Sequence, residues 1–205
     1  MKKGLRCGAW FCALALTFSL AAGAAYTDLD PKAWYYGAVQ KSIDSGLMMG
    51  TDTTHFSPMA PVSRATVLTV LWRLEGSPAA VADPGFTDVA DGAWYYAPAA
   101  WAKEAGIAAG YKDGSFAPEG NVTREQLAVF LCRYAEYQRQ PPAKGVLEVY
   151  PDAAAVSGWA ADGMRHALGM GLITGNGRGE LDPAGVATRA ALAVIVGRLT
   201  VTAQG

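Results

Sequence analysis

The 205-residue sequence is poor in cysteine, histidine and charge. Its three cysteines are too few for a disulfide scaffold, and its two histidines, His55 and His166, lack the ligand spacing of a zinc site. Charged residues make up 17% and the formal net charge is −1, so there is no basic field to attract nucleic acid. We expect no metal, no cofactor and no nucleic-acid partner.

The sequence also lacks the short motifs of common catalytic sites. It has no Gly-x-Ser-x-Gly, no P-loop and no dinucleotide fingerprint. Its carboxylates are scattered, and no two are placed as the acid and base of a glycosidase. We therefore predict no catalytic residues and no enzyme, with a small glycan hydrolase as the less favoured alternative.

Long hydrophobic runs are confined to the N-terminus, although hydrophobic residues make up 51% of the chain and can form a core. Three basic residues before position 7 precede an apolar stretch at 9–20 and then Ala22-Gly23-Ala24. This order is typical of an export signal, and the stretch is shorter than the ~20 residues of a membrane span. We predict a signal peptide at 1–24, cleaved after residue 24 or 25, and a secreted chain with no membrane segment afterwards.

The rest of the sequence consists of three copies of one unit. Trp94 follows Trp34 by 60 residues, and Trp159 follows Trp94 by 65. Other motifs keep the same spacing: aromatic-x-Asp at 26–28, 86–88 and 150–152; Gly-x-x-x-Gly at 46–50, 106–110 and 171–175; and x-x-Pro at 56–58, 116–118 and 181–183. The function must therefore be read through the repeat. We predict copies at 26–76, 86–137 and 150–199.

Each copy is predicted to form a helix, a loop and a second helix. In the first copy, Asp30-Pro31 is a start signal for a helix that Gly46 ends. Asp113-Gly114 is a tight-turn signal, so short hairpins are compatible with the loops. Two short helices cannot bury both apolar faces alone. We predict a mainly α fold in which the three repeats pack as a pseudo-threefold helical bundle.

The second helices have their own start signals. Ser63, Thr123 and Thr188 stand at the N-cap positions, and Thr123 with Gln126 has the pattern of a capping box.

These motifs at this spacing resemble the S-layer homology (SLH) domain over residues 26 to about 199. The resemblance implies non-covalent attachment of an exported protein to the bacterial cell wall, at the cell surface or S-layer. It implies a secondary cell-wall polysaccharide as ligand, often with pyruvylated amino sugars, held in grooves between copies. The family's Thr-Arg-Ala-Glu motif matches residues 63–66, 123–126 and 188–191, which keep the arginine and lack the final glutamate.

The three arginines of this motif, Arg64, Arg124 and Arg189, are the main candidate polysaccharide-binding residues. Each follows an N-cap, where free N–H groups and the helix dipole favour an anion, and a guanidinium matches a carboxylate. Since a cation at this helix end is locally unfavourable, a compensating partner is expected. That partner is either an acidic sugar or an internal aspartate, since Asp28, Asp88 and Asp152 recur with equal fidelity.

The aromatic residues divide into two groups. Trp34 and Trp94 recur at a predicted helix start, which favours a place in the core. Trp101 occurs only in the second copy, where the other copies have Lys41 and His166. Its ring is a candidate for stacking on a sugar, with surface packing as the alternative.

Three glycines and one cysteine complete the candidates. Gly50, Gly110 and Gly175 are predicted to serve turns with positive φ, which is compatible with close approach of a ligand. Cys132 lies in an apolar stretch and is predicted to be a buried, unreactive thiol.

A structural protein that assembles into a surface layer or docks a partner is the alternative function. Self-association or a non-covalent protein partner is therefore compatible with the sequence, with glycan contact incidental.

Overall fold

The computed structural model describes residues 26–80 and 82–202, and this part of the chain is mainly helical. The predicted signal peptide at 1–24 lies outside the described residues. The elements are α1 (Tyr36–Asp44), α2 (Arg64–Leu74), α3 (Tyr96–Glu104), α4 (Arg124–Tyr137), the 3-10 turns η1 (Ala153–Ala155) and η2 (Gly158–Ala160), α5 (Ala161–Gly169) and α6 (Arg189–Thr202). The predicted mainly α, three-repeat fold is confirmed. Within these residues no helix has the length and apolar character needed to span a membrane.

The first helix of the first copy begins later than predicted. Asp30 does not cap a helix at Pro31, because its carboxylate accepts the N–H of Lys32 in a turn (2.9 Å) and α1 begins only at Tyr36. The predicted end is confirmed, since Gly46 follows α1 with φ +69°. Asp113-Gly114 forms its turn, with the N–H of Gly114 donating to the Tyr111 carbonyl. The described ranges contain isolated β-bridges and no hairpin strands.

The predicted caps of the second helices are formed. The Ser63 side chain accepts the N–H of Thr66, and Thr123 forms a complete capping box with Gln126. Thr188 accepts the N–H of Ala191 at the start of α6.

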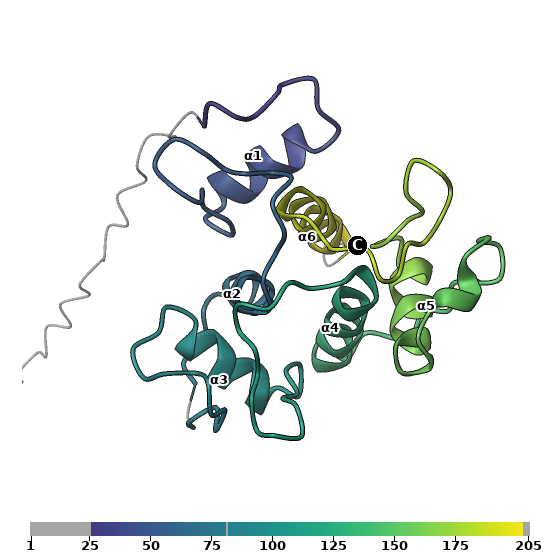
Figure 1. Ribbon diagram of the computed structural model, residues 1–205. Helices are drawn as coiled ribbons and strands as arrows, with labels where there is room; N and C mark the ends of the chain where they lie inside the picture. The colour runs from purple at the N-terminus through teal and green to yellow at the C-terminus, as the bar shows by residue number, and fades with distance from the viewer. Residues whose placement is uncertain (1–25, 81, 203–205) are drawn as a thin grey trace, which may run out of the picture.

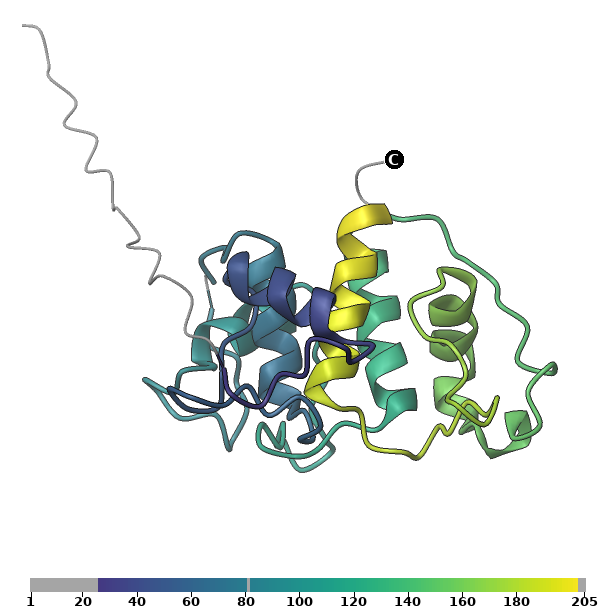
Figure 2. The same cartoon turned by 90° about the horizontal axis from the view of Figure 1, so that it is seen from above.

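The helices pair between copies rather than within them. In Figure 1, α1 lies against α6, α3 against α2 and α5 against α4, so each first helix packs on the second helix of the preceding copy in a closed cycle. The second helices α2, α4 and α6 stand around the centre, and Figure 2 shows α4 and α6 side by side from above. The core is therefore shared by all three copies.

A ring of three backbone hydrogen bonds closes the centre. Val62 donates its N–H to the Ala187 carbonyl (2.9 Å), Ala187 donates to Val122 (2.8 Å), and Val122 donates back to Val62 (3.0 Å). Each bond joins two different copies, so the ring fixes the pseudo-threefold arrangement just before the three second helices begin.

Candidate functional site

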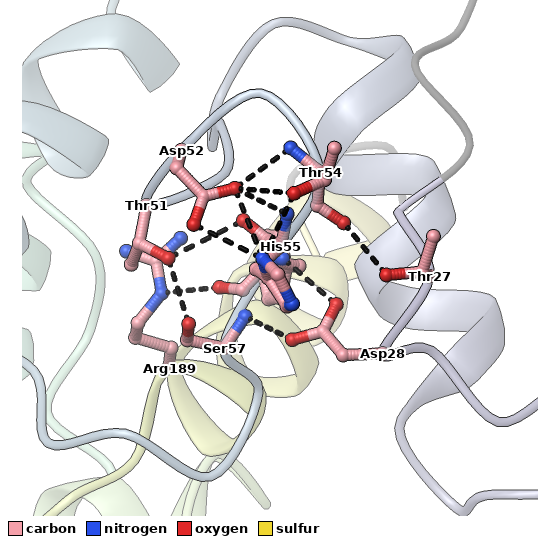
Figure 3. A network of polar contacts seen from close by, with 9 residues as sticks. Thr27, Asp28, Thr51, Asp52, Thr54, His55, Ser57 and Arg189 are labelled. Atoms are coloured by element: carbon pink, nitrogen blue, oxygen red, sulfur yellow. Dashed lines mark hydrogen bonds and ion pairs between the residues drawn. The ribbon is translucent and has the colours of Figure 1, made fainter.

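Each copy contains a loop of the same geometry, and the aspartate of the aromatic-x-Asp motif of that copy holds it in place. In the first copy, the Asp28 carboxylate accepts the N–H groups of Phe56 (2.9 Å) and Ser57 (2.7 Å), as Figure 3 shows for Ser57. Desolvation alone would raise the pKa of Asp28, but these backbone N–H bonds outweigh it and the net pKa is lowered. Asp88 and Asp152 make the matching pairs of bonds to residues 116–117 and 181–182.

The aspartates fix these loops in an unfavourable backbone conformation. Ser57, Ala117 and Asp182 have φ of +57°, +54° and +50°, the left-handed region that residues with a Cβ seldom adopt. Each of the three donates its N–H to the aspartate of its own copy. The loop geometry thus depends on the carboxylate.

The three candidate arginines reach across to these loops in the next copy. Arg64 donates from Nε to the Phe116 carbonyl (2.7 Å) and from Nη2 to the Ala109 carbonyl (3.3 Å). Arg124 makes the same two bonds to the carbonyls of Leu181 and Thr174, and Arg189 to those of Phe56 and Met49. Arginine and aspartate therefore hold opposite sides of the same loop, from different copies.

The arginines do not form direct ion pairs with the repeated aspartates. Ion pairs seen among the described residues, such as Arg165–Glu148 and Arg178–Glu180, involve other side chains. The internal alternative considered from the sequence is therefore realised as an Asp–peptide–Arg relay, in which the charges are separated by a peptide group.

The backbone N–H groups at the second-helix starts do not serve as an anion site, so that expectation was wrong. Arg64 donates its backbone N–H to the Gly120 carbonyl (3.0 Å) and Ala65 to Pro118 (2.8 Å). The starts of α4 and α6 donate in the same way to residues 183–185 and 58–60. The loop of the next copy takes these donors, and only the guanidinium groups remain for an anion.

Burial makes the positive charge of the guanidinium groups less favourable than it would be in water. Arg64 is 8% exposed, and its guanidinium carbon lies 4.4 Å from the centre of the Phe116 ring. Desolvation lowers the pKa of Arg64, and it does the same to Arg124 and Arg189. The bonds seen among the described residues use two of the five N–H donors of each arginine. A further acceptor carrying negative charge would compensate the desolvated cation.

Three grooves lie around these arginines. Each contains one of the glycines Gly50, Gly110 and Gly175, and we name each groove after its glycine. Their volumes are about 310, 270 and 630 Å³. Each takes its loop and an arginine from one copy, the motif arginine from the preceding copy and a tryptophan from the following copy. The sets are Arg73, Arg189 and Trp94 at Gly50; Arg133, Arg64 and Trp159 at Gly110; and Arg198, Arg124 and Trp34 at Gly175.

The repeated tryptophans are exposed, so the place in the core predicted for Trp34 and Trp94 was wrong. Trp34 is 65% exposed, Trp94 58% and Trp159 62%. The neighbouring Tyr35 is buried instead and meets the Trp34 ring edge to face, at 5.5 Å between centres. Sequence reasoning missed these tryptophans as groove residues, although their recurrence in all three copies was the available signal.

Trp101, in contrast, is buried. It is 4% exposed and packs edge to face on Tyr137 at 5.6 Å, and it lines none of the three grooves. The expectation that its ring stands open to a sugar is therefore wrong.

The groove glycines have no positive φ, so the turn explanation was also wrong. Their hydrogen atoms face the aromatic ring that begins the same copy. A Cβ on Gly110 would lie 2.7 Å from Phe86 Cε1, and one on Gly175 would lie 3.0 Å from Tyr150 Cε1. At Gly50 the N–H also donates to the Tyr26 hydroxyl (2.7 Å). Glycine is needed for close packing inside the protein.

A second repeated arginine was not predicted as a site residue. Arg73 donates to the Leu47 carbonyl (3.1 Å) and Arg133 to the Ile107 carbonyl (3.5 Å). Arg198 donates to the carbonyls of Gly171 (3.1 Å) and Leu172 (2.9 Å). Each groove therefore holds two guanidinium groups anchored on neutral carbonyls.

The remaining chemistry of the described residues is sparse. They contain no group of three metal-ligating side chains. Cys132 is half-buried rather than fully buried, and burial raises the pKa of its thiol, with the nearby Glu136 acting in the same direction. A raised thiol pKa disfavours the reactive thiolate.

The fold and its grooves define a three-copy, pseudo-threefold helical module. The family model of the S-layer homology domain matches residues 25–68, 85–128 and 149–193. The chain belongs to the S-layer homology domain family, in three tandem copies.

Similar regions occur in much longer proteins. The chain is 34% identical to the surface-layer 125 kDa protein of Lysinibacillus sphaericus over 167 residues, covering 78% of this chain and 14% of that protein. It is 31% identical to an endoglucanase of Bacillus sp. (strain KSM-635) over 175 residues, covering 85% and 18%. It is 23% identical to the S-layer protein of Bacillus thuringiensis subsp. finitimus, covering 87% and 21%. The family and these relatives associate the chain with the bacterial cell surface.

Proposed function

We propose that the chain attaches non-covalently to the bacterial cell wall by binding anionic, pyruvylated secondary cell-wall polysaccharide in its three grooves. The observation that carries the proposal is the threefold recurrence of two guanidinium groups and one exposed indole in each groove, from three copies. Export by the predicted signal at 1–24 would bring the chain to this ligand. The relatives, which include surface-layer proteins and an endoglucanase, are compatible with an anchoring role.

The chemistry of the grooves suits an acidic sugar. A pyruvyl carboxylate can accept two N–H bonds from a guanidinium, and here the guanidinium is already oriented by carbonyls of the neighbouring copy. The anion would also compensate the desolvation that lowers the arginine pKa. The exposed indole offers a flat apolar face and an N–H donor to the sugar ring beside the carboxylate.

Three grooves on one module favour a repetitive polymer. When one groove is filled, the next acidic sugars of the same chain are held near the other grooves at high effective concentration. Weak binding at each groove would then give strong retention on the wall without a covalent bond.

The test is co-sedimentation of the purified chain with purified cell wall. We expect Trp34→Ala, Trp94→Ala and Trp159→Ala together to reduce retention at least about a hundredfold, since each lost stacking contact is worth roughly 1 kcal/mol. The melting temperature should change little because the rings are exposed. Val149→Ala, also at an exposed apolar residue, is the matched control and should bind as the unmodified chain does.

Two results would favour other functions. Retention unchanged in the triple variant, with concentration-dependent oligomers in the absence of wall, would support the surface-layer alternative. Release of reducing ends from purified wall would support the hydrolase alternative and contradict a purely binding role.

A further inference from the structure

The packing of α1 on α6 leaves an open recess of about 720 Å³ beside the Gly175 groove. Its lining comes from both helices and the segment before the groove, and includes Gly37, Lys41, Thr174, Val194, Gly197 and Arg198. Three of these residues, Thr174, Val194 and Arg198, also line the Gly175 groove. Recess and groove are therefore adjoining parts of one depression.

The corresponding face of the other two first helices is filled. The residues equivalent to Lys41 are Trp101 on α3 and His166 on α5, which are 4% and 5% exposed. Trp101 is covered by Tyr137, and the Nδ1 atom of His166 accepts the N–H of Ala143 from the preceding linker (3.3 Å). In the first copy, Lys41 is exposed instead.

The opposite wall of the recess, formed by α6, also has a smaller residue than the equivalent helices of the other two copies. The residue equivalent to Gly197 is Trp72 in the first copy and Cys132 in the second. A Cβ added to Gly197 would meet no atom within 4 Å, and the same holds for Gly37 across the recess. Among the residues that the structure describes, no side chain fills this space.

The recess is basic. Lys41 and Arg198 are its charged lining residues, and the described residues that line it include no carboxylate. Arg198 donates to the carbonyls of Gly171 and Leu172, which holds it where recess and groove meet. In the groove, Arg124 adds a third cation, with Asp182 as the acidic residue of that lining.

We propose that the Gly175 groove and this recess form one extended site for a segment of acidic polysaccharide several sugars long. One acidic sugar lies at Arg124 and Trp34, and a second acidic group further along the chain lies at Lys41. This inference rests on the proposed function, and it makes the groove of the third copy the main site, since Trp101 and His166 are buried at the positions equivalent to Lys41 beside the other two grooves.

Calorimetry on the full chain tests this with two probes, a single pyruvylated amino sugar and wall-polysaccharide fragments several repeat units long. A background with Trp94→Ala and Trp159→Ala weakens the other two grooves relative to the Gly175 groove. We expect Lys41→Glu to weaken binding of the long fragments about tenfold, as for reversal of a charge near an anion, and to leave the single sugar unchanged. Gly197→Trp, which introduces the ring found at position 72, should have the same effect. Lys32→Glu, at an exposed lysine outside these linings, is the control.

The outcomes separate the two proposals. If the unmodified chain binds neither probe, the proposed function fails and the extended site fails with it. If both probes bind but Lys41→Glu and Lys32→Glu behave alike, the extended site alone is wrong. A Gly197→Trp variant that changes the oligomeric state in light scattering, with glycan affinity unchanged, would assign the recess to a second copy of the chain and overturn the proposal. Lys41→Glu, an exposed substitution, keeps the test valid even if Gly197→Trp misfolds.

Discussion

Arg64, in the first copy, and Trp159, in the third, line the same groove, and the floor of that groove belongs to the second copy. No single copy therefore contains a complete site. The cyclic pairing of the helices produces this arrangement. Each copy contributes its motif arginine to the groove of one neighbouring copy and its tryptophan to the groove of the other. Folding and the assembly of the grooves consequently depend on the same contacts between copies.

Replacing a motif arginine should affect both binding and stability. Arg124→Ala removes a cation from the Gly175 groove and leaves the carbonyls of Leu181 and Thr174 without their donor. We expect wall binding to fall and the free energy of unfolding in urea to drop by about 1–3 kcal/mol. Arg165→Ala, which removes an exposed arginine paired with Glu148, is the control and should change neither by more than about 0.5 kcal/mol. Full stability in Arg124→Ala would contradict the structural role.

Gly50→Ala should destabilise the first copy. The added Cβ would lie 2.6 Å from the His55 carbonyl oxygen and would also meet the Tyr26 ring, so loop and ring must move apart. We expect a loss of about 1–3 kcal/mol in the free energy of unfolding, as for other overpacked sites. Gly158→Ala has open space around the new Cβ and no positive φ, and should be tolerated. Equal melting temperatures for the two variants would refute the close-packing explanation.

Ala117→Gly should stabilise the protein. Ala117 has φ +54°, and glycine adopts this conformation without the steric cost of a Cβ. The expected gain is about 1 kcal/mol in the free energy of unfolding. The reverse sign is expected for Ala38→Gly inside α1, where glycine costs roughly 0.5–1 kcal/mol. A loss of stability in Ala117→Gly would show that the methyl group makes contacts worth more than the strain.

The loop aspartates predict a dependence of stability on acid pH. The pKa of Asp28 is lowered on folding, and that of Asp152 likewise, by backbone N–H bonds that outweigh desolvation. A carboxyl with a depressed folded pKa stabilises the fold above its unfolded pKa of about 4, and this is lost as the pH falls through the folded value. The free energy of unfolding in urea should decline steeply as the pH falls from about 5 to about 2. The decline should be shallower in Asp28→Asn, and an unchanged slope would contradict this.

The repeat made much of the fold predictable from the sequence. Fixed spacing identified the copies, and local signals such as Ser63, Thr123 and Gly46 correctly marked helix ends, because capping depends on a few neighbouring residues. The limits 26–76, 86–137 and 150–199 stay a prediction. The late start of α1 was missed because the Asp30 side chain can equally serve a turn.

The grooves could not be assembled from the sequence because they depend on how the copies pair. Arg64 and Thr66 belong to one motif, yet Arg64 lines the Gly110 groove and Thr66 the Gly50 groove. The missing glutamate at position 66 therefore does not affect the orientation of Arg64, which carbonyls of the second copy fix. Periodicity likewise could not tell exposed Trp94 from buried Trp101, since both are tryptophans, one just before α3 and one within it.

Titration of the unmodified chain with wall polysaccharide, before and after mild acid has removed its pyruvyl groups, examines the role of the guanidinium groups without altering the protein. The account predicts saturable binding to the intact polymer and a loss of at least about tenfold in affinity once the carboxylates are gone, as for the loss of a charge-assisted bidentate pair. Equal affinity for both forms of the polymer would contradict it.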